Sequence, residues 1–419
     1  MCQLDDSGNN PAGTIPFVFR FLFAMNKRLV CLVGCLAATL FLQSFPLGAQ
    51  SVPPNILPKA VLDVMQRVAN WQLAHPFSHE LTDWTQGTSD AGFMALAGIS
   101  GDARYRAAMR AIGETNGWKL GPRKFNADDC CVGQTYAELY LIYREPKMIA
   151  QVQAQFDEVL AGSSAVNSVD SSKPEAGEQW WWCDSLFMAP PVWMRLYAAT
   201  GDERYMNYAV TNWWRTTASL YDKDEHLFFR DSAYFNKKEA NGKNVFWGRG
   251  NGWVMGGLVR VLQFLPANHS DRSRFEQLFK DMAAKILNCQ QPDGLWRASL
   301  LDPEDYPLKE TSGSSFYTYA LAWGVNQGLL DRVTFEPAVC KAWAALVSCV
   351  DGAGKLTHVQ PIGADPKKFA PESTEVYGVG AFLLAGSEVY RLTASEMDKS
   401  KPEKTSDSAS ILGQTQQKN

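Results

Sequence analysis

The sequence lacks the short motifs that mark several large enzyme classes. It contains no HExxH motif, no GxSxG motif, no dinucleotide fingerprint and no GxxxxGK[ST] phosphate loop. Its five histidines are scattered along the chain, and no CxxC pair occurs. These absences argue against zinc proteases, serine hydrolases of the α/β type, nucleotide-binding enzymes and a histidine or cysteine metal site.

The sequence also lacks an excess of positive charge, and runs of alternating β-branched residues are scarce. The formal net charge is -4, and no basic stripe occurs that would favour nucleic acid as a partner. Apolar residues instead recur at helical intervals, as Val61, Val64 and Val68 do within residues 60–75. The sequence therefore predicts helices almost throughout, with short extended pieces only around residues 226–229 and 355–359.

The N-terminus contains a targeting segment. A positive stretch begins at Met25, an apolar run follows, and PLGAQS supplies a small-residue cleavage site near Ala49. Residues 25–49 are therefore predicted to be a signal peptide, and residues 1–24 an over-extended start. The prediction is export to the periplasm or the medium, without a membrane span in the mature chain. The alternatives are an N-terminal anchor and a lipoprotein, since Leu32–Cys35 matches a lipoprotein cleavage box.

Six cysteines remain after this segment, too few for a disulfide scaffold in a chain of this length. Most are predicted to be buried thiols. They are Cys130, Cys131, Cys183, Cys289, Cys340 and Cys349.

An imperfect repeat organises the rest of the chain. ISGDARY (99–105) resembles ATGDERY (199–205), and in each the glycine can end one helix while the aspartate caps the next. Similar joints recur every roughly 45–65 residues, which indicates about six helical hairpins. Six hairpins closed into a ring form an all-α (α/α)6 barrel, predicted over residues 55–393, with an open solenoid as the alternative. Residues 394–419 are predicted to be a disordered polar tail.

Aromatic residues are abundant, with 14 tryptophans, 14 tyrosines and 22 phenylalanines. This composition fits a protein that stacks on sugars, although any one ring could equally belong to a thick aromatic core. The stretch EQWWWCDSLFMAPP (178–191) places Asp184 directly after three tryptophans and a cysteine. A carboxylate in such surroundings is costly unless it is paired, hydrogen-bonded or needed. Asp184 is therefore either a helix cap or a catalytic acid.

Three further motifs contain polar side chains suited to a sugar site. In FNADDCCVGQTY (125–136), two aspartates precede an apolar helix, and one of them is expected to cap it. In FWGRGNGW (246–253), glycines permit close approach of a ligand and Arg249 can clamp a carboxylate. The alternative for this motif is a tight loop with Arg249 on the surface. ETSGSSF (310–316) is predicted to begin an N-capped helix.

Taken together, these motifs resemble the unsaturated rhamnogalacturonyl hydrolases of glycoside hydrolase family 105, which are related to unsaturated glucuronyl hydrolases. WCDSLFMAPPVWMRLYAATGD and FWGRGNGWV carry the resemblance, and ADDCCVGQTYAELY, ETSGSSFYTYALAWGV and EVYGVGAFLLAGSEVYRL extend it over residues 60–392. It implies an (α/α)6 barrel that hydrates the C4=C5 double bond of a 4,5-unsaturated uronic acid. The substrates would be lyase-generated oligosaccharides, here from rhamnogalacturonan or pectin, and no metal or organic cofactor would be needed.

The resemblance also implies roles for individual residues. The proton donor falls on Asp184, and the second acidic position on Asp128, with Asp129 as the alternative. Arg249 would hold the substrate carboxylate and Trp253 would stack on the sugar ring. Some family members have a histidine where this chain has Arg230, so the exact uronide and the leaving sugar stay open. The further substrate-binding candidates are Arg230, Trp247, Asn251, Trp182, Asp129 and Trp84.

Two other functions fit the same residues. A conventional glycosidase would use Asp128 and Asp184 as its two carboxyl groups and would cleave saturated oligosaccharides. A non-catalytic sugar-binding protein could use the same helical barrel. The protein is expected to be a monomer or a small homo-oligomer.

Overall fold

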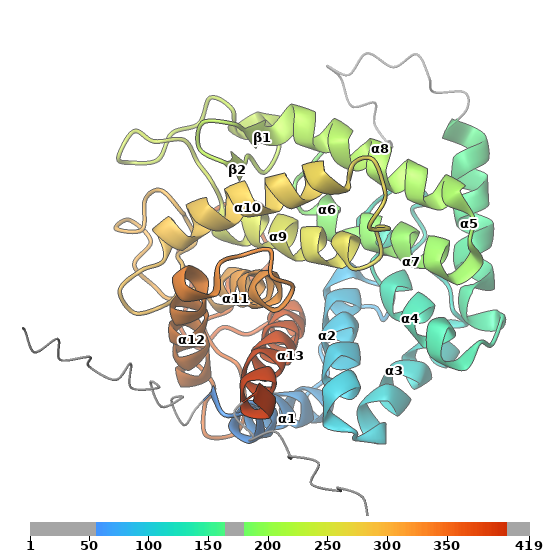
Figure 1. The fold of residues 1–419 in the computed structure, drawn as a ribbon, viewed down its shortest axis with the longest axis horizontal. Coiled ribbons are helices and arrows are strands. Elements are labelled where there is room, and N and C mark those ends of the chain that lie inside the picture. The colour runs from blue at the N-terminus through green and yellow to red at the C-terminus, as the bar shows by residue number, and fades with distance from the viewer. Residues whose placement is uncertain (1–55, 164–179, 400–419) are drawn as a thin grey trace, which may run out of the picture. The chain divides into compact units, whose positions relative to one another are not determined.

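The computed structural model of the protein describes residues 56–163 and 180–399, where helices dominate. The predicted N-terminal extension and signal peptide lie outside this part. The long helices alternate between an outer and an inner layer (Figure 1). The outer helices are α1 (Pro58–Ala74), α3 (Ala103–Asn116), α5 (Lys147–Ser163), α8 (Glu203–Leu220), α10 (Arg272–Cys289) and α12 (Arg332–Ser348). The inner helices are α2 (Trp84–Ser100), α4 (Gly133–Tyr143), α7 (Pro190–Thr200), α9 (Gly248–Leu262), α11 (Thr311–Asn326) and α13 (Val376–Lys399).

The inner helices form a closed ring. Each packs on the next in chain order, and the last one, α13, packs extensively on the first, α2. Two short helical turns precede inner helices: η2 (Asp128–Cys130) lies before α4, and α6 (Ser185–Met188) lies before α7 and packs on α9. This arrangement confirms the predicted (α/α)6 barrel and excludes the open solenoid.

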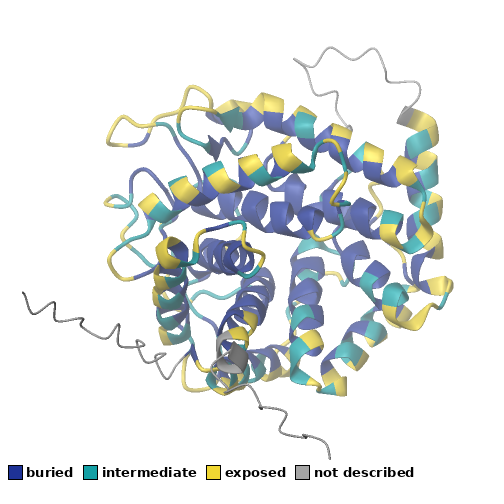
Figure 2. Ribbon diagram, viewed as in Figure 1, coloured by how far each residue is buried: buried dark blue, intermediate teal, exposed yellow. Residues whose placement is uncertain are grey.

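Burial distinguishes the two layers (Figure 2). Every residue of α9 is buried, and α11 is buried from Thr311 to Val325. The outer helices alternate buried and exposed residues because each covers the inner layer with one stripe only. The predicted face of α1 is confirmed, since Val61, Val64 and Val68 are all buried.

The predicted joints are confirmed in detail. Gly101 ends α2 and Gly201 ends α7, each in the left-handed region with φ of +67° and +76°. Asp102 and Asp202 then cap α3 and α8 by accepting hydrogen bonds from the N–H groups of Arg104 (2.9 Å) and Arg204 (3.0 Å). Both joints therefore connect the C-terminal end of an inner helix to the start of an outer one.

Longer connections precede several of the inner helices at their other ends. The segment between α8 and α9 contains the antiparallel strands β1 (Tyr221–Asp222) and β2 (Leu227–Phe228), followed by the turn η3 (Ser232–Tyr234). The extended piece predicted near residues 226–229 is thus present. Among the described residues, the extended piece predicted near 355–359 forms no strand. One isolated β-bridge joins its Leu356 to Val350.

The C-terminal helix runs further than expected. Helix α13 continues to Lys399, past the predicted boundary of the barrel at residue 393. The sequence TASEMDK contains neither glycine nor proline, so nothing local ends the helix there. The rest of the predicted tail lies outside the described residues.

The cysteine prediction is also confirmed. Five of the six are buried free thiols, and Cys340 is half-buried.

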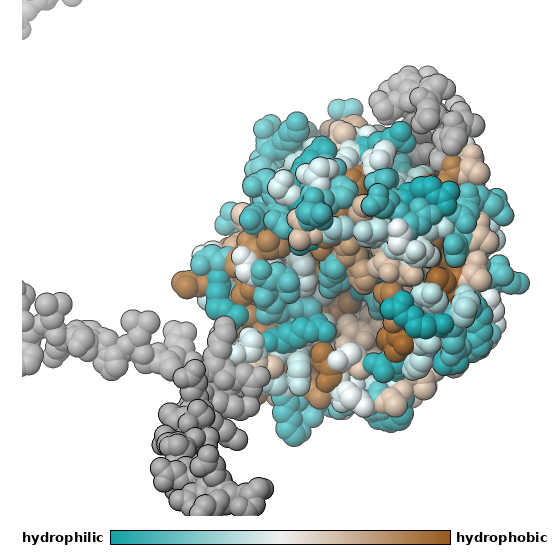
Figure 3. Space-filling view, turned by 45° about the vertical axis from the view of Figure 1, so that its right-hand side comes forward, coloured by the Kyte–Doolittle hydropathy of each residue, from teal (hydrophilic) through white to brown (hydrophobic). Residues whose placement is uncertain are grey.

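The surface is mixed in character. Figure 3 shows hydrophilic residues over most of the face drawn, with hydrophobic residues in small separate patches. Within the described part of the chain, no helix combines the length and hydrophobicity needed to cross a membrane.

Glycines allow the inner helices to approach closely, and two of them provide a matched test. A Cβ on Gly257 of α9 would lie 2.3 Å from the carbonyl oxygen of Leu186 in α6, whereas one on Gly98 of α2 would meet nothing within 4 Å. We expect Gly257→Ala to destabilise the protein by about 1–3 kcal/mol and Gly98→Ala to stabilise it by about 0.4–1 kcal/mol. Urea denaturation of both variants measures the difference. Equal effects would contradict the packing described here.

Candidate active site

The N-terminal ends of the inner helices meet at one end of the barrel. The ring of Trp84 at the start of α2 lies 5.1 Å from that of Tyr377 in α13 and 5.8 Å from that of Trp253 in α9. The turn η2, which begins at Asp128, and the helix α6, which follows Asp184, are also in contact. Residues that are far apart in the sequence are therefore brought to one place by the ring of helices.

Asp184 is a buried carboxyl group that caps nothing. It occupies the residue before α6, but its side chain accepts no hydrogen bond from that helix, and it is only 8% exposed. The Cys183 thiol donates to its Oδ2 at 3.4 Å, and Arg230 Nε lies 3.6 Å from the same oxygen. Burial raises the pKa of Asp184 above its usual value, although the positive charge of Arg230 opposes the shift. The helix-cap interpretation is therefore excluded.

Asp128 is a second carboxyl group with a raised pKa. Burial, followed by the negative charge of Asp184, raises the pKa of Asp128 to about 7. Within residues 56–163 and 180–399, no hydrogen-bond donor to its carboxylate is found. Its backbone N–H donates to Asn126 Oδ1 at 2.9 Å, and its carbonyl oxygen accepts from the N–H of Cys131 at 3.0 Å. Because nearby carboxylates repel each other, ionisation of one acid disfavours ionisation of the other.

Asp129 has a different role from its neighbour. Its carboxylate accepts from the backbone N–H of Arg123 at 2.6 Å and from the guanidinium of the same residue at 2.5 and 3.1 Å. It closes the loop before η2 and is buried, which leaves Asp128 as the acid that accompanies Asp184. The expectation that one of the two aspartates caps the following helix is wrong. The chain enters α4 through the turn η2, and no side chain caps α4.

Arg230 presents a guanidinium beside Asp184. It follows β2 and donates from Nη1 to Asp231 Oδ2 at 2.6 Å. Its Nε, which faces Asp184, is buried and has no hydrogen-bond partner, while the side chain as a whole is 21% exposed. This arginine is therefore partly accessible and places a positive charge beside Asp184, which suits the binding of a substrate carboxylate.

Arg249 uses its guanidinium within the protein, although its positive charge also lowers the pKa of Asp184. It is fully buried, and its two terminal nitrogens donate to the carbonyl oxygens of Gln360 and, at 3.0 Å, Pro361. Its guanidinium also lies 4.6 Å and 4.9 Å from the ring centres of Trp247 and Tyr377. The prediction that Arg249 clamps the substrate carboxylate is not supported by this geometry, and neither is the surface-loop alternative. The guanidinium instead holds the segment around residues 360–361 against α9.

Two other residues of the same motif are also used internally. The Asn251 amide accepts from Phe228 N at 2.8 Å and donates to Phe228 O at 3.0 Å, so it holds β2 in place. Trp247 is buried and its Nε1 donates to Gln360 Oε1 at 3.0 Å. The glycines between them permit close packing within the protein rather than close approach to a ligand. A Cβ on Gly252, for example, would lie 3.2 Å from Gly313 Cα of α11.

The tryptophans that are exposed differ from those predicted to contact the sugar. Trp253 is buried against Phe316, with ring centres 4.5 Å apart, and Trp182 is buried as well, so neither offers a free face for a sugar. Trp84 is only partly buried. Trp181 was not among the predicted binding residues, but it is 47% exposed. Its ring centre lies 5.8 Å from Cζ of the Arg230 guanidinium. The run WWW could not show which ring is exposed, because that depends on residues distant in the sequence.

Two supporting groups complete this end of the barrel. The predicted N-capped helix start is confirmed, and Glu310 is the cap, accepting from Ser312 N at 3.0 Å and Gly313 N at 2.7 Å. His79 Nε2 lies 3.2 Å from Glu375 Oε2, joining the segment before α2 to the start of α13. Among the described residues, no group of three or more His, Cys, Asp or Glu side chains is arranged to hold a metal ion.

The chain is similar to known proteins over most of its length. The model of Glycosyl Hydrolase Family 88 matches residues 59–393. An unsaturated 3S-rhamnoglycuronyl hydrolase of Formosa agariphila is 42% identical over 78% of this chain and 90% of its own length. A protein of the same description from Alteromonas sp. is 32% identical over 81% of this chain and 88% of its own. The solved structure of a family 88 glycosyl hydrolase from Bacteroides vulgatus is 29% identical, with a TM-score of 0.73 over 80% of this chain and 99% of that one.

Proposed function

Since this chain belongs to glycosyl hydrolase family 88 and is a glycoside hydrolase, we propose that it removes a 4,5-unsaturated uronic acid from the non-reducing end of lyase-generated oligosaccharides. The names of its relatives support rhamnose as the sugar linked to that uronic acid. The observation that carries the proposal is the buried Asp184 next to the partly exposed Arg230, together with the half-buried Asp128, both acids having a raised pKa. Rhamnogalacturonan fragments are the first substrates to test.

The position of Arg230 orients the substrate. In an unsaturated uronic acid the carboxylate is attached to C5, which is one end of the double bond. Arg230 Nε lies 3.6 Å from Asp184 Oδ2, so a carboxylate held by this arginine places C4 and C5 next to the Asp184 carboxyl group. Trp181, which packs under the same guanidinium, offers an exposed face for a sugar ring.

The chemistry then follows from protonation. Protonated Asp184 gives its proton to C4, and the ring oxygen stabilises the positive charge that develops at C5. Water adds at C5 and loses a proton to the ionised carboxylate, which restores the acid. The resulting hemiketal opens, and the bond at C1 breaks to release the leaving sugar. The environment suits this step because burial favours the neutral, proton-carrying form of both acids.

The test follows the ultraviolet absorbance of the conjugated double bond. Rhamnogalacturonan fragments produced by a lyase are expected to lose this absorbance when the protein is added. Saturated fragments of the same composition serve as the control and are expected to remain intact. Cleavage of the saturated fragments would indicate the conventional two-carboxylate mechanism, and binding without any loss of absorbance would indicate a sugar-binding protein.

The acid pair also predicts the pH dependence of the reaction. The proton donor Asp184 must be protonated, and burial raises its pKa above the usual value. We therefore expect kcat/KM to fall as the pH rises through this raised pKa. In Asp128→Asn, the negative charge that helps to keep the pair protonated is absent, so the alkaline limb is expected to move to lower pH. A pH profile of kcat/KM for both proteins measures the shift, and an unmoved limb would contradict the coupling.

A further inference from the structure

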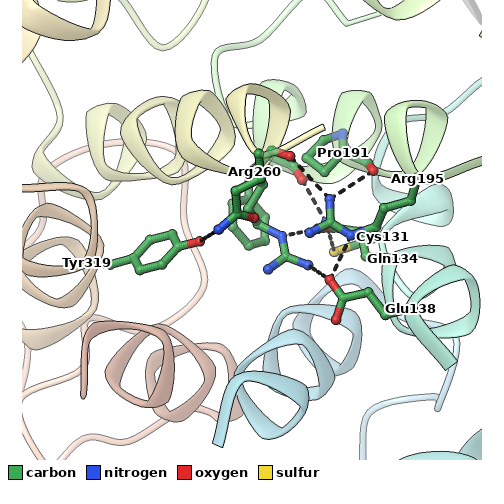
Figure 4. A network of polar contacts seen from close by, with 9 residues as sticks. Cys131, Gln134, Glu138, Pro191, Arg195, Arg260 and Tyr319 are labelled. Atoms are coloured by element: carbon green, nitrogen blue, oxygen red, sulfur yellow. Dashed lines mark hydrogen bonds and ion pairs between the residues drawn. The ribbon is translucent and has the colours of Figure 1, made fainter. Parts of the chain in front are cut away.

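A cavity lies at the opposite end of the barrel from Asp184 and Asp128. Its volume is about 320 Å³, and it is lined by the C-terminal halves of inner helices. The polar side chains around it form the network drawn in Figure 4, to which α4, α7, α9 and α11 all contribute. The candidate catalytic residues lie at the N-terminal ends of the same helices, so the cavity is separate from the proposed active site.

Two buried arginines in this cavity share one carboxylate oxygen. Arg195 Nε and Arg260 Nη2 each lie 2.7 Å from Oε1 of Glu138. Arg195 is only 1% exposed and Arg260 only 3% exposed. One carboxylate therefore faces two guanidinium groups, and a buried charge without full compensation is costly. Consistent with this imbalance, burial and then the charge of Arg260 lower the pKa of Arg195 to about 10.

The other charged residues of the cavity do not restore the balance. Arg391 donates to Glu388 Oε1 at 2.6 Å, so these two neutralise each other. Three arginines and two glutamates line the cavity, which leaves one positive charge in excess. The C-terminal ends of helices favour cations, and Arg195 also donates to the carbonyl oxygens of Pro191 and Arg260. These contacts explain why the arginines are tolerated, but they supply no counter-charge inside the cavity.

Neutral hydrogen-bonding groups accompany the arginines. Gln263 Nε2 donates to the Tyr319 hydroxyl oxygen at 3.3 Å, and no acceptor for the hydroxyl proton of Tyr319 is found among the described residues. Met94, Phe264 and Leu384 supply an apolar wall to the same cavity. A ligand that fits would be small, would be negatively charged and would accept hydrogen bonds.

We propose that this cavity is a binding site for a small oxyanion, either inorganic sulfate or the carboxylate of a small organic acid. Such an anion would neutralise the excess charge of Arg195 and Arg260 and accept hydrogen bonds from Arg391 and Tyr319. Because the buried arginines also hold the helices together, the residue suited to mutation is Arg391, whose side chain is 46% exposed.

The experiment measures the thermal unfolding of the full chain with increasing sodium sulfate or sodium acetate, against sodium chloride at equal ionic strength. A saturable rise in Tm is expected with sulfate, acetate or both, because a ligand that binds only the folded state stabilises it. A response to sulfate alone identifies the inorganic source, and a response to acetate alone identifies the carboxylate. The apparent Kd of Arg391→Gln is expected to be about tenfold weaker, as is that of Tyr319→Phe.

Two matched variants locate the site. Lys280→Gln also removes one positive charge, but from the exposed face of α10, and it is expected to respond like the wild type. Arg230→Gln is expected to keep the response too, which excludes anion binding at the proposed active site as its source. The proposal is overturned if the wild type shows no saturable rise beyond chloride. It is also overturned if Arg391→Gln and Lys280→Gln respond equally, or if Arg230→Gln alone loses the response.

Discussion

Asp184→Asn is expected to lower kcat for the unsaturated oligosaccharide by about 10²–10⁴-fold, because the amide cannot deliver a proton to C4. The fold should persist, since the carboxylate caps no helix and the amide has the same shape. Burial raises the pKa of Asp184, which means that the folded state binds this proton more tightly than the unfolded state. The ionised form therefore costs stability at higher pH, and the variant should melt no lower than the wild type there.

A second buried aspartate provides the matched control for this substitution. Asp90 of α2 is fully buried, its Oδ2 has no hydrogen-bond partner, and burial raises its pKa to about 7. Asp90→Asn is expected to keep full activity and to be more stable than the wild type above about pH 7, where the native carboxyl would ionise. If Asp184→Asn keeps full activity, or if Asp90→Asn loses as much, the proton donor has been assigned to the wrong residue.

Arg230→Gln is expected to lower kcat/KM by roughly 30- to 1000-fold, equivalent to about 2–4 kcal/mol, because the substrate carboxylate loses its charged partner. The variant also changes the acid pair. The charge of Arg230 lowers the pKa of Asp184, so its removal should raise that pKa and move the alkaline limb of kcat/KM to higher pH. The expected direction is opposite to that of Asp128→Asn, and pH profiles of the two variants distinguish the roles.

The substrate itself supplies the control for Arg230. A methyl ester of the unsaturated uronide lacks the negative charge, so wild type and Arg230→Gln should process it at similar rates. Arg249→Gln should behave differently, mainly by lowering Tm, since the Arg249 guanidinium holds Gln360 and Pro361. If Arg249→Gln, rather than Arg230→Gln, processes the ester at the rate of the wild type, then Arg249 binds the carboxylate, as the family resemblance implies.

The family relationship predicted from the motifs is confirmed. The motifs resemble family 105 and the related unsaturated glucuronyl hydrolases, and the matching family model is that of Glycosyl Hydrolase Family 88. The motifs and the named relatives indicate the same chemistry, the hydrolysis of unsaturated uronyl oligosaccharides. The motif around Asp184 was informative because a lone carboxylate among aromatic residues is unusual whatever the fold.

Local signals determined the architecture. Helical spacing of apolar residues, and the Gly-Asp joints at Gly101–Asp102 and Gly201–Asp202, act over a few residues and are readable in one dimension. These signals were sufficient to predict the helical hairpins. The number of hairpins then favoured their closure into a ring. Asp184 and Asp128 were predicted as the acids from the family resemblance, because residue type and neighbouring residues alone left Asp184 as either a helix cap or a catalytic acid.

Only the tertiary structure decided which side chains of each motif face the site. The Arg249 guanidinium is held by carbonyl groups more than a hundred positions along the chain, at Gln360 and Pro361. Trp181 rather than Trp182 is exposed, and the arginine at the acid pair is Arg230. The charge imbalance of the far cavity likewise needs α4, α7 and α9 together. The physical reason is the same in each case: periodicity and capping are local interactions, whereas burial and the pairing of charges depend on contacts that exist only after the ring has closed.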